Sequence, residues 1–266
     1  MFLFLGFGFV GCSAVKLSYD FADWLIEYRL EEYVDLRGEQ EDRLQTKLKE
    51  FMRWHRNEIM PNVVLMSADL KAAQESRNVV GTFAKLQPRL DMLYRESAQR
   101  LARIVGDVFY TLSAKQIEEL EYSLKEKFEE RFNEASAAPD KPYERFVERM
   151  DNWLGGLQDG QKELFRGNKA PLRRQSRMRF ECRRVRQNEL ISLLKGNSER
   201  EKIQGKLIQW WTMSNCGEES DRARIAMRST MLKSMSELEQ TLTTQQQGRL
   251  GERLTDLYSS LKDIVD

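Results

Sequence analysis

Seven arginines lie within fourteen consecutive positions, and they are the side chains best suited to bind a charged ligand. The segment spans residues 173–186, where Glu181 is the only acid. The arginines are Arg173, Arg174, Arg177, Arg179, Arg183, Arg184 and Arg186. A guanidinium group binds phosphate or carboxylate through a rigid fork of N–H donors, so phospholipid headgroups, lipopolysaccharide phosphates or an acidic protein surface could bind here. We prefer the alternative that these arginines pair with acids of neighbouring helices, in 118–130 or 199–201.

The sequence contains few residues that could carry out catalysis or bind a metal ion. His55 is the single histidine, and no two cysteines have the spacing of zinc ligands. No glycine-rich phosphate loop follows a strand. Acidic pairs such as Glu118-Glu119 and Glu129-Glu130 are typical of solvated helix faces. We therefore expect no enzymatic activity, no cofactor and no metal site.

Charge balance and composition predict an all-α protein that does not bind nucleic acid. Lys and Arg total 43 against 42 Asp and Glu, so the net charge is near zero and gives little attraction to a polyanion. Long runs rich in Glu, Lys, Arg, Gln and Leu place apolar residues at helical spacing, and only five of the 266 residues are prolines. We expect a multi-helix bundle of long antiparallel helices.

A leucine followed four residues later by a glutamine occurs four times, each time where a helix could begin. The copies are Leu36–Gln40, Leu112–Gln116, Leu157–Gln161 and Leu242–Gln246. In the second copy, Ser113 can cap the helix while Gln116 closes a capping box. Thr243 and Gln246 can do the same in the fourth copy. Because repeated helix starts indicate repeated helices, we predict two related helical halves, 19–138 and 141–266.

Prolines, glycines and apolar spacing predict the remaining elements. We expect new helices at Pro61 and at Pro88, because proline suits the first turn of a helix. Small residues and prolines indicate a linker over 135–142. Further helices are expected over 143–153, from Pro171 to 195, over 198–215, over 219–240 and after Gln246.

The N-terminal residues predict export and lipid attachment. Residues 1–10, MFLFLGFGFV, are too few to cross a bilayer as a helix but fit the core of a signal peptide. Together with Gly11, Cys12 and Ser13 they resemble a bacterial lipobox, so we assign 1–11 as a lipoprotein signal peptide. The resemblance implies that Cys12 becomes the lipid-bearing N-terminus, followed by a tether over 12–18. Ser13 is compatible with the outer membrane, facing the periplasm; the alternative is an apolar segment packed into the fold.

The other two cysteines, Cys182 and Cys216, would then lie in an oxidising compartment where a disulfide could persist. If 171–195 and 198–215 form a straight hairpin, Cys182 lies opposite a position near Trp211. Cys216 is then displaced by about 7 Å along the helix axis, beyond comfortable bridging range. We therefore favour two free, partly buried thiols, although a bent or shifted pairing could close the bridge.

The helix-start motif also carries a family resemblance. Leu242-Thr-Thr-Gln-Gln246, and Leu112–Gln116 with Ser for Thr, resemble the LTXXQ-motif periplasmic proteins, the Spy and CpxP-like family. That family consists of small helical chaperones and stress regulators that form cradle-like dimers with a client-binding surface. Gly11-Cys12-Ser13, Val15–Tyr19, Tyr33–Gln40 and Trp54-His55 also resemble a family of uncharacterised proteobacterial lipoproteins.

These observations predict a lipid-anchored bacterial envelope protein without catalysis. A Spy-like role would be to bind unfolded or envelope proteins through apolar helix surface rich in aromatic residues and methionines. The alternative is a structural lipoprotein that docks on an envelope assembly or anionic lipid through the Arg-rich helix. The membrane would be contacted through the N-terminal lipid, and the oligomeric state stays open.

Overall fold

The computed structural model describes residues 12–212 and 216–266, and the expected signal peptide at 1–11 lies outside them. The described chain is helical without a β-strand, which confirms the predicted fold class. The helices are α1 (Cys12–Asp20), α2 (Ala22–Glu31), α3 (Glu39–Trp54), α4 (Met60–Glu75), α5 (Val79–Tyr110), α6 (Ala114–Ala137), α7 (Lys141–Leu154), α8 (Asp159–Glu163), α9 (Lys169–Lys195), α10 (Arg200–Thr212), α11 (Glu218–Gln240) and α12 (Thr244–Val265). A π-helical turn, η1 (His55–Ile59), joins α3 to α4, and a 3₁₀ turn, η2 (Arg166–Asn168), precedes α9.

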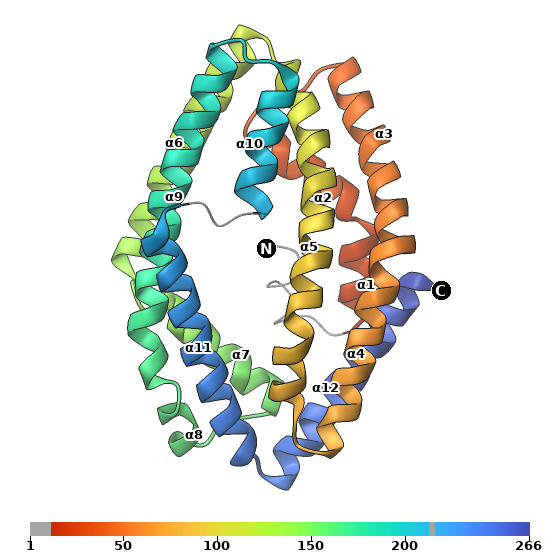
Figure 1. Cartoon of the computed structure of the whole chain (residues 1–266), viewed down its shortest axis with the longest axis vertical. Coiled ribbons are helices and arrows are strands. Elements are labelled where there is room, and N and C mark those ends of the chain that lie inside the picture. The colour runs from red at the N-terminus through yellow and green to blue at the C-terminus, as the bar shows by residue number, and fades with distance from the viewer. Residues whose placement is uncertain (1–11, 213–215) are drawn as a thin grey trace.

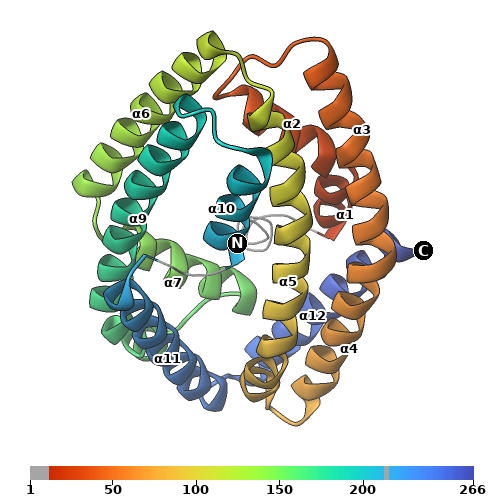
Figure 2. The ribbon, with the colours of Figure 1, turned by 45° about the horizontal axis from the view of Figure 1, so that its top comes forward.

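The long helices run between two ends of an elongated molecule, the upper and lower ends of Figure 1. α3, η1 and α4 form one rod beside α5, whereas α6 and α9 lie on the other side (Figures 1 and 2). The start of α3 and the α5–α6 turn lie at the upper end. The α4–α5 turn, α8 and the α11–α12 turn lie at the lower end.

Three hydrophobic clusters among the described residues hold these helices together. The upper cluster contains Leu44 and Leu120, which are fully buried, and joins α3, α5, α6, α9 and α10. A second cluster joins α1, α4, α5 and α12, and a third joins α7, α11 and their neighbours at the lower end. Because α10 packs on α5 and α12 packs on α4 and α1, the two sequence halves are interleaved rather than separate domains.

Pro88 does not begin a helix, contrary to the prediction. It lies inside α5, which begins at Val79. The first backbone N–H groups of this helix need acceptors. Glu239 of α11 provides them, since its Oε1 accepts hydrogen bonds from the N–H of Val79 at 2.5 Å and of Val80 at 3.4 Å. This cap comes from a distant part of the chain, so local sequence does not reveal it. Pro61, in contrast, lies in the first turn of α4 as predicted.

Residues 12–18, expected to form a tether, are part of helix α1. Val15 is buried in the cluster shared with α12, and the Lys16 ammonium donates to the carbonyl oxygen of Asp263 at 2.9 Å. Packing against α12 therefore orders this segment, which its sequence pattern did not indicate. Within the described ranges, no helix is both long enough and apolar enough to span a bilayer.

Cys182 and Cys216 form a disulfide, so the preference for two free thiols was wrong. The straight hairpin assumed for α9 and α10 is absent because α10 packs mainly on α5. Cys216 precedes α11, which packs against α9 and brings the cysteine beside Cys182. Their Cα atoms are 5.4 Å apart, within the usual range for a disulfide.

Reduction of this disulfide should lower the free energy of unfolding. The two cysteines are 34 positions apart, and closing a loop of that length in the unfolded chain is worth about 3–4 kcal/mol in the chain-entropy model. Urea denaturation with and without reductant measures the loss. The double variant Cys182→Ala/Cys216→Ala is the control, because reductant should leave its stability unchanged. Equal stability of the oxidised protein and the double variant would contradict the prediction.

Candidate functional site

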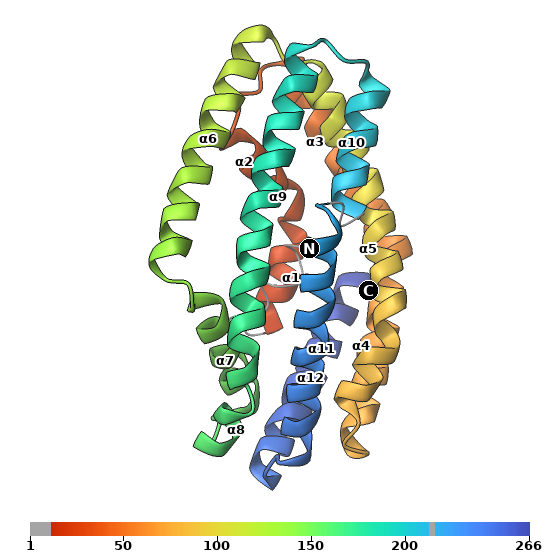
Figure 3. The ribbon, with the colours of Figure 1, turned by 60° about the vertical axis from the view of Figure 1, so that its left-hand side comes forward.

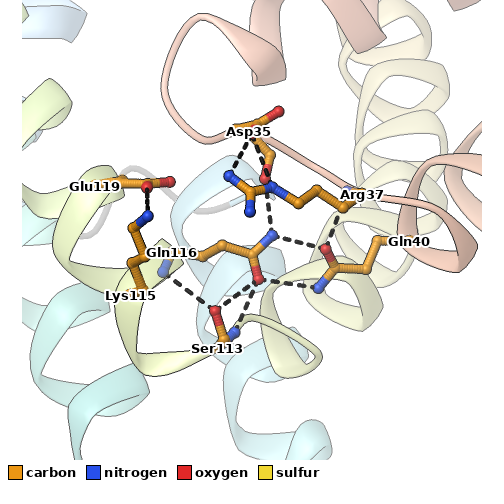
Figure 4. Close-up of polar contacts among 7 residues, drawn as sticks. All are labelled: Asp35, Arg37, Gln40, Ser113, Lys115, Gln116 and Glu119. Atoms are coloured by element: carbon orange, nitrogen blue, oxygen red, sulfur yellow. Dashed lines mark hydrogen bonds and ion pairs between the residues drawn. The ribbon is translucent and has the colours of Figure 1, made fainter.

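The first two motif glutamines pair at the upper end of the molecule (Figure 4). Gln116 Nε2 donates to Gln40 Oε1 at 2.7 Å, and Gln40 Nε2 lies 3.3 Å from Gln116 Oε1. Each amide also donates to a backbone carbonyl beside the other motif: Gln116 to Asp35 at 2.8 Å and Gln40 to Thr111 at 2.7 Å. The pair thus joins the loop before α3 to the α5–α6 turn.

The third and fourth glutamines form the same arrangement at the lower end. Gln161 Nε2 donates to Gln246 Oε1 at 2.9 Å, and Gln246 Nε2 donates to Gln161 Oε1 at 2.8 Å. Gln246 donates to the carbonyl of Gly156 at 2.7 Å and Gln161 to that of Thr241 at 3.0 Å. Asp35 and Gly156 each precede a motif leucine, as do Thr111 and Thr241. The two ends therefore share one hydrogen-bond pattern.

The glutamines also cap their own helices. Ser113 Oγ accepts a hydrogen bond from the N–H of Gln116, and Thr243 Oγ1 accepts one from Gln246, so the two predicted capping boxes are confirmed. In all four copies the glutamine Oε1 accepts from the backbone N–H three residues earlier. The donors are Arg37 at 3.3 Å and Ser113, Gln158 and Thr243 at 3.0 Å.

The motif leucines lie in the core beneath the amides. Leu36 and Leu112 are buried in the upper cluster, whereas Leu157 and Leu242 are buried in the lower one. A buried amide is costly unless its donors and acceptors are satisfied, and here each glutamine finds its partners in two chain segments. At each end, two leucines therefore pack in the hydrophobic core, and two glutamines hold the two chain segments in register.

Carboxamide pairs can align segments but cannot act as acids or bases. A primary amide stays neutral around neutral pH and offers only hydrogen bonds. The ion pairs Asp35–Arg37 and Lys115–Glu119 flank the upper pair (Figure 4) but are largely exposed and contribute little. The motif residues therefore stabilise structure rather than carry out chemistry.

The sequence predicted the helix starts but not the pairing of the glutamines. One signal was available: the caps differ, with Ser113 and Thr243 in two copies and Arg37 and Gln158 in the others, whereas glutamine is constant. A glutamine that is present even where the cap position varies indicated a role besides completing a Ser or Thr cap. The two pairs are separated by 76 and 85 positions, so only the tertiary fold reveals them.

The Arg-rich segment forms most of α9, and its first arginines are already paired. Arg173 binds Asp140, which also binds Lys169 at 2.7 Å, and Arg174 binds Glu219 at 2.9 Å. Hydrogen bonds from Arg173 and then Lys169 lower the pKa of Asp140 to about 2. The expected acids were in 118–130 or 199–201; these two arginines pair elsewhere because the start of α9 packs beside α7 and α11.

Further along α9, desolvation is the largest influence on the pKa values of three arginines. Desolvation lowers the pKa values of Arg179, Arg183 and Arg186, and Arg131 of α6 adds a repulsive charge beside Arg183. By solvent accessibility Arg177, Arg179 and Arg184 are exposed, whereas Arg183 and Arg186 are partly buried. The structure thus divides the seven arginines among different environments instead of gathering them on one face.

Three phenylalanines from two helices form an aromatic cluster beside these arginines. We call Phe128, Phe132 and Phe180 the phenylalanine cluster; their ring centroids lie 5.8–6.1 Å apart. Phe132 is 43% exposed, and the guanidinium of Arg183 lies 5.9 Å from the centre of the Phe180 ring. The cluster therefore presents apolar surface with cationic groups beside it.

His55 is partly buried in an aromatic environment. It begins η1, and its Nδ1 lies 2.9 Å from the hydroxyl of Tyr19 in α1. Its ring stands edge-on to that of Trp54, the preceding residue. Burial lowers the pKa of His55 to about 4 and raises the pKa of Tyr19. The contact between the His55 ring and the Tyr19 hydroxyl therefore links α1 to η1, the turn between α3 and α4.

One acidic cluster lies in the described part of the chain. Carboxylate oxygens of Glu27, Glu31 and Glu41 approach one another within 4.8 Å, and Gln45 donates to Glu27 at 2.8 Å. Burial, followed by the two neighbouring charges, raises the pKa of Glu31. Glu27 is buried and Glu31 is exposed, and no observation besides this grouping of carboxylates points to a metal, so the cluster supports no metal assignment.

Replacing Gln116 should destabilise the protein more than the loss of a helix cap alone. Gln116→Ala removes the cap and leaves buried polar groups without partners, which should cost about 2–4 kcal/mol of unfolding free energy. Gln116→Glu keeps the capping acceptor but cannot donate to Asp35 or Gln40, so it should destabilise as well. Thermal and urea denaturation check both variants. Full stability of Gln116→Glu would show that only the cap matters.

Acidification should destabilise the protein partly through His55. Its pKa of about 4 in the folded chain lies below the unfolded value of about 6.5, so the unfolded chain binds the proton more strongly between these pH values. Neutral His55 therefore makes its full contribution to the free energy of unfolding above pH 6.5. This contribution decreases as the pH falls toward 4, by at most about 3 kcal/mol. Urea denaturation of the wild type and His55→Phe across this range isolates the effect. Parallel pH profiles would contradict it.

Comparisons with known proteins place the chain in a family. A family model, described as a family of unknown function (DUF6279), matches residues 32–214. This range contains Gln40, Gln116 and Gln161 and the whole Arg-rich helix α9. No curated protein and no solved structure matches the chain. Because the match covers more than half of the sequence, the chain belongs to the DUF6279 family of unknown function.

Proposed function

We propose that the protein is a lipid-anchored, non-catalytic protein of the bacterial cell envelope that binds apolar segments of other proteins. The observation that carries the location is the Cys182–Cys216 disulfide. Disulfides persist mainly in oxidising compartments, which in bacteria lie outside the cytoplasm. The lipobox-like sequence before Cys12 supports the same location and adds attachment to a membrane.

The glutamine pairs and the phenylalanine cluster together support a binding role better than a catalytic one. The paired glutamines are neutral amides whose hydrogen bonds are used within the protein. The phenylalanine cluster, in contrast, leaves Phe132 exposed and has the Arg183 guanidinium beside Phe180, an arrangement that suits apolar segments flanked by acidic residues. Docking of an anionic partner on α9 is less well supported, because Arg173 and Arg174 already bind acids.

Lipid anchoring is tested by intact-mass analysis and membrane fractionation of protein expressed from its native locus. We expect a membrane-bound chain that begins at Cys12 and carries lipid mass. A Cys12→Ser variant should be recovered without lipid and in the soluble fraction. A wild-type chain that retains Met1 and has no lipid mass would contradict the proposed anchoring.

Client binding is tested by light scattering of an unrelated unfolded protein. The wild type should suppress aggregation, and Phe132→Ser should reduce suppression several-fold because Phe132 is the exposed ring of the cluster. Tyr122→Ser is the matched control: Tyr122 is 68% exposed on the same helix but is not part of the cluster. Wild-type protein without any effect would favour docking on a specific envelope partner instead.

A further inference from the structure

An exposed apolar stripe runs along the first two helices. Leu17, Phe21, Trp24 and Tyr28 follow one another at intervals of four, three and four residues, and Leu25 adjoins them, so they share a helix face. The first three are 57%, 53% and 54% exposed, which is unusual for such large side chains. We call these five residues the N-terminal stripe.

The backbone holds the stripe together across the junction of α1 and α2. The N–H of Phe21 donates to the Leu17 carbonyl at 3.2 Å, and the N–H of Leu25 donates to the Phe21 carbonyl at 2.9 Å. Two hydrogen bonds therefore cross the junction, where Phe21 itself departs from helical dihedral angles. The rings of Trp24 and Tyr28 stack with centroids 5.4 Å apart, so these two side chains form one aromatic surface within the stripe.

The opposite side of the same helices is fixed to the protein. Val15 and Ala22 are buried, α1 packs on α12, and α2 packs on α3. In Figure 1 α2 crosses behind α5 and α1 lies between α5 and α3, and in Figure 3 both helices lie to the left of α5. The stripe is the side of these helices that their neighbours leave uncovered.

We propose that the N-terminal stripe lies in the headgroup region of the bilayer to which Cys12 is attached; this rests on the proposed lipid anchoring. Cys12 is the first residue of α1, and Leu17 follows about 7 Å along the helix. Leu17 to Tyr28 then spans about 16 Å at 1.5 Å per residue. A lipid on Cys12 would hold this stretch against the membrane surface, which makes the bilayer its occupant.

The side chains of the stripe suit the membrane interface. Trp and Tyr combine an apolar ring with a polar group and prefer the boundary between water and hydrocarbon, and Phe and Leu add apolar area. Nearby cations are already engaged: Arg56 binds Asp20 at 3.0 Å and Arg29 binds Glu32 at 2.8 Å. Docking therefore depends on apolar contact rather than on attraction to anionic headgroups.

Fluorescence quenching by brominated lipid tests the proposal. The full chain is expressed in a Gram-negative host, purified from its membranes and reconstituted into phosphatidylethanolamine–phosphatidylglycerol vesicles with or without brominated acyl chains. Tryptophan emission should fall with brominated lipid. This loss should disappear in Trp24→Phe and persist in Trp153→Phe, a control on α7. Circular dichroism verifies that both variants fold.

Intact mass, measured on the same samples, separates the two claims. Lipid mass together with quenching that depends on Trp24 supports the stripe. Lipid mass with equal quenching in both variants overturns the stripe and leaves the anchoring intact. A chain without lipid mass overturns the anchoring, and Trp24-dependent quenching then still supports membrane contact by the stripe. A Trp24-dependent dimer without quenching would assign the stripe to a second copy of the chain.

Discussion

Mutual hydrogen bonding between buried glutamines is the constraint on which the rest of the structure depends. A carboxamide has two donors and an acceptor oxygen, and burying it is tolerable only when these groups are satisfied. Gln116 and Gln246 are buried, and each finds its partners on a segment far away in the sequence. The pairs hold the helix starts in register while the motif leucines pack beneath them. Directional hydrogen bonds and the burial of apolar side chains therefore stabilise the same two ends of the molecule.

The interleaving of helices connects these two ends. α5 extends along the molecule, receives α10 near its upper end, and is capped at its lower end by Glu239 of α11. Gln74 at the end of α4 donates to the carbonyl of Gln247 at 3.0 Å, which adds a further link to α12. Because the glutamines of the motif use their hydrogen bonds internally, the proposed binding to other molecules falls to helix faces such as the phenylalanine cluster and the N-terminal stripe.

The helices could be predicted because interactions between residues close in sequence determine where they begin. Apolar spacing, Pro61 at a first turn and the capping boxes at Ser113 and Thr243 are set by residues within one or two helical turns, and the structure contains them. Four features depend on distant contacts and were therefore missed or wrong: the glutamine pairs, the start of α5 upstream of Pro88, the ordering of 12–18 and the disulfide. Lipid attachment at Cys12 and the relation between the two sequence halves stay predictions.

Hydrogen exchange of the turns that carry the glutamine pairs tests the central claim most directly. If the pairs fix both ends, the backbone amides of Gln116 and Gln246 should exchange as slowly as amides in the middle of α5, which open only with the core. The turn at Ala138–Asp140, which joins two helices without such a pair, provides the comparison and should exchange faster. Exchange of Gln116 and Gln246 as fast as that turn would contradict the account.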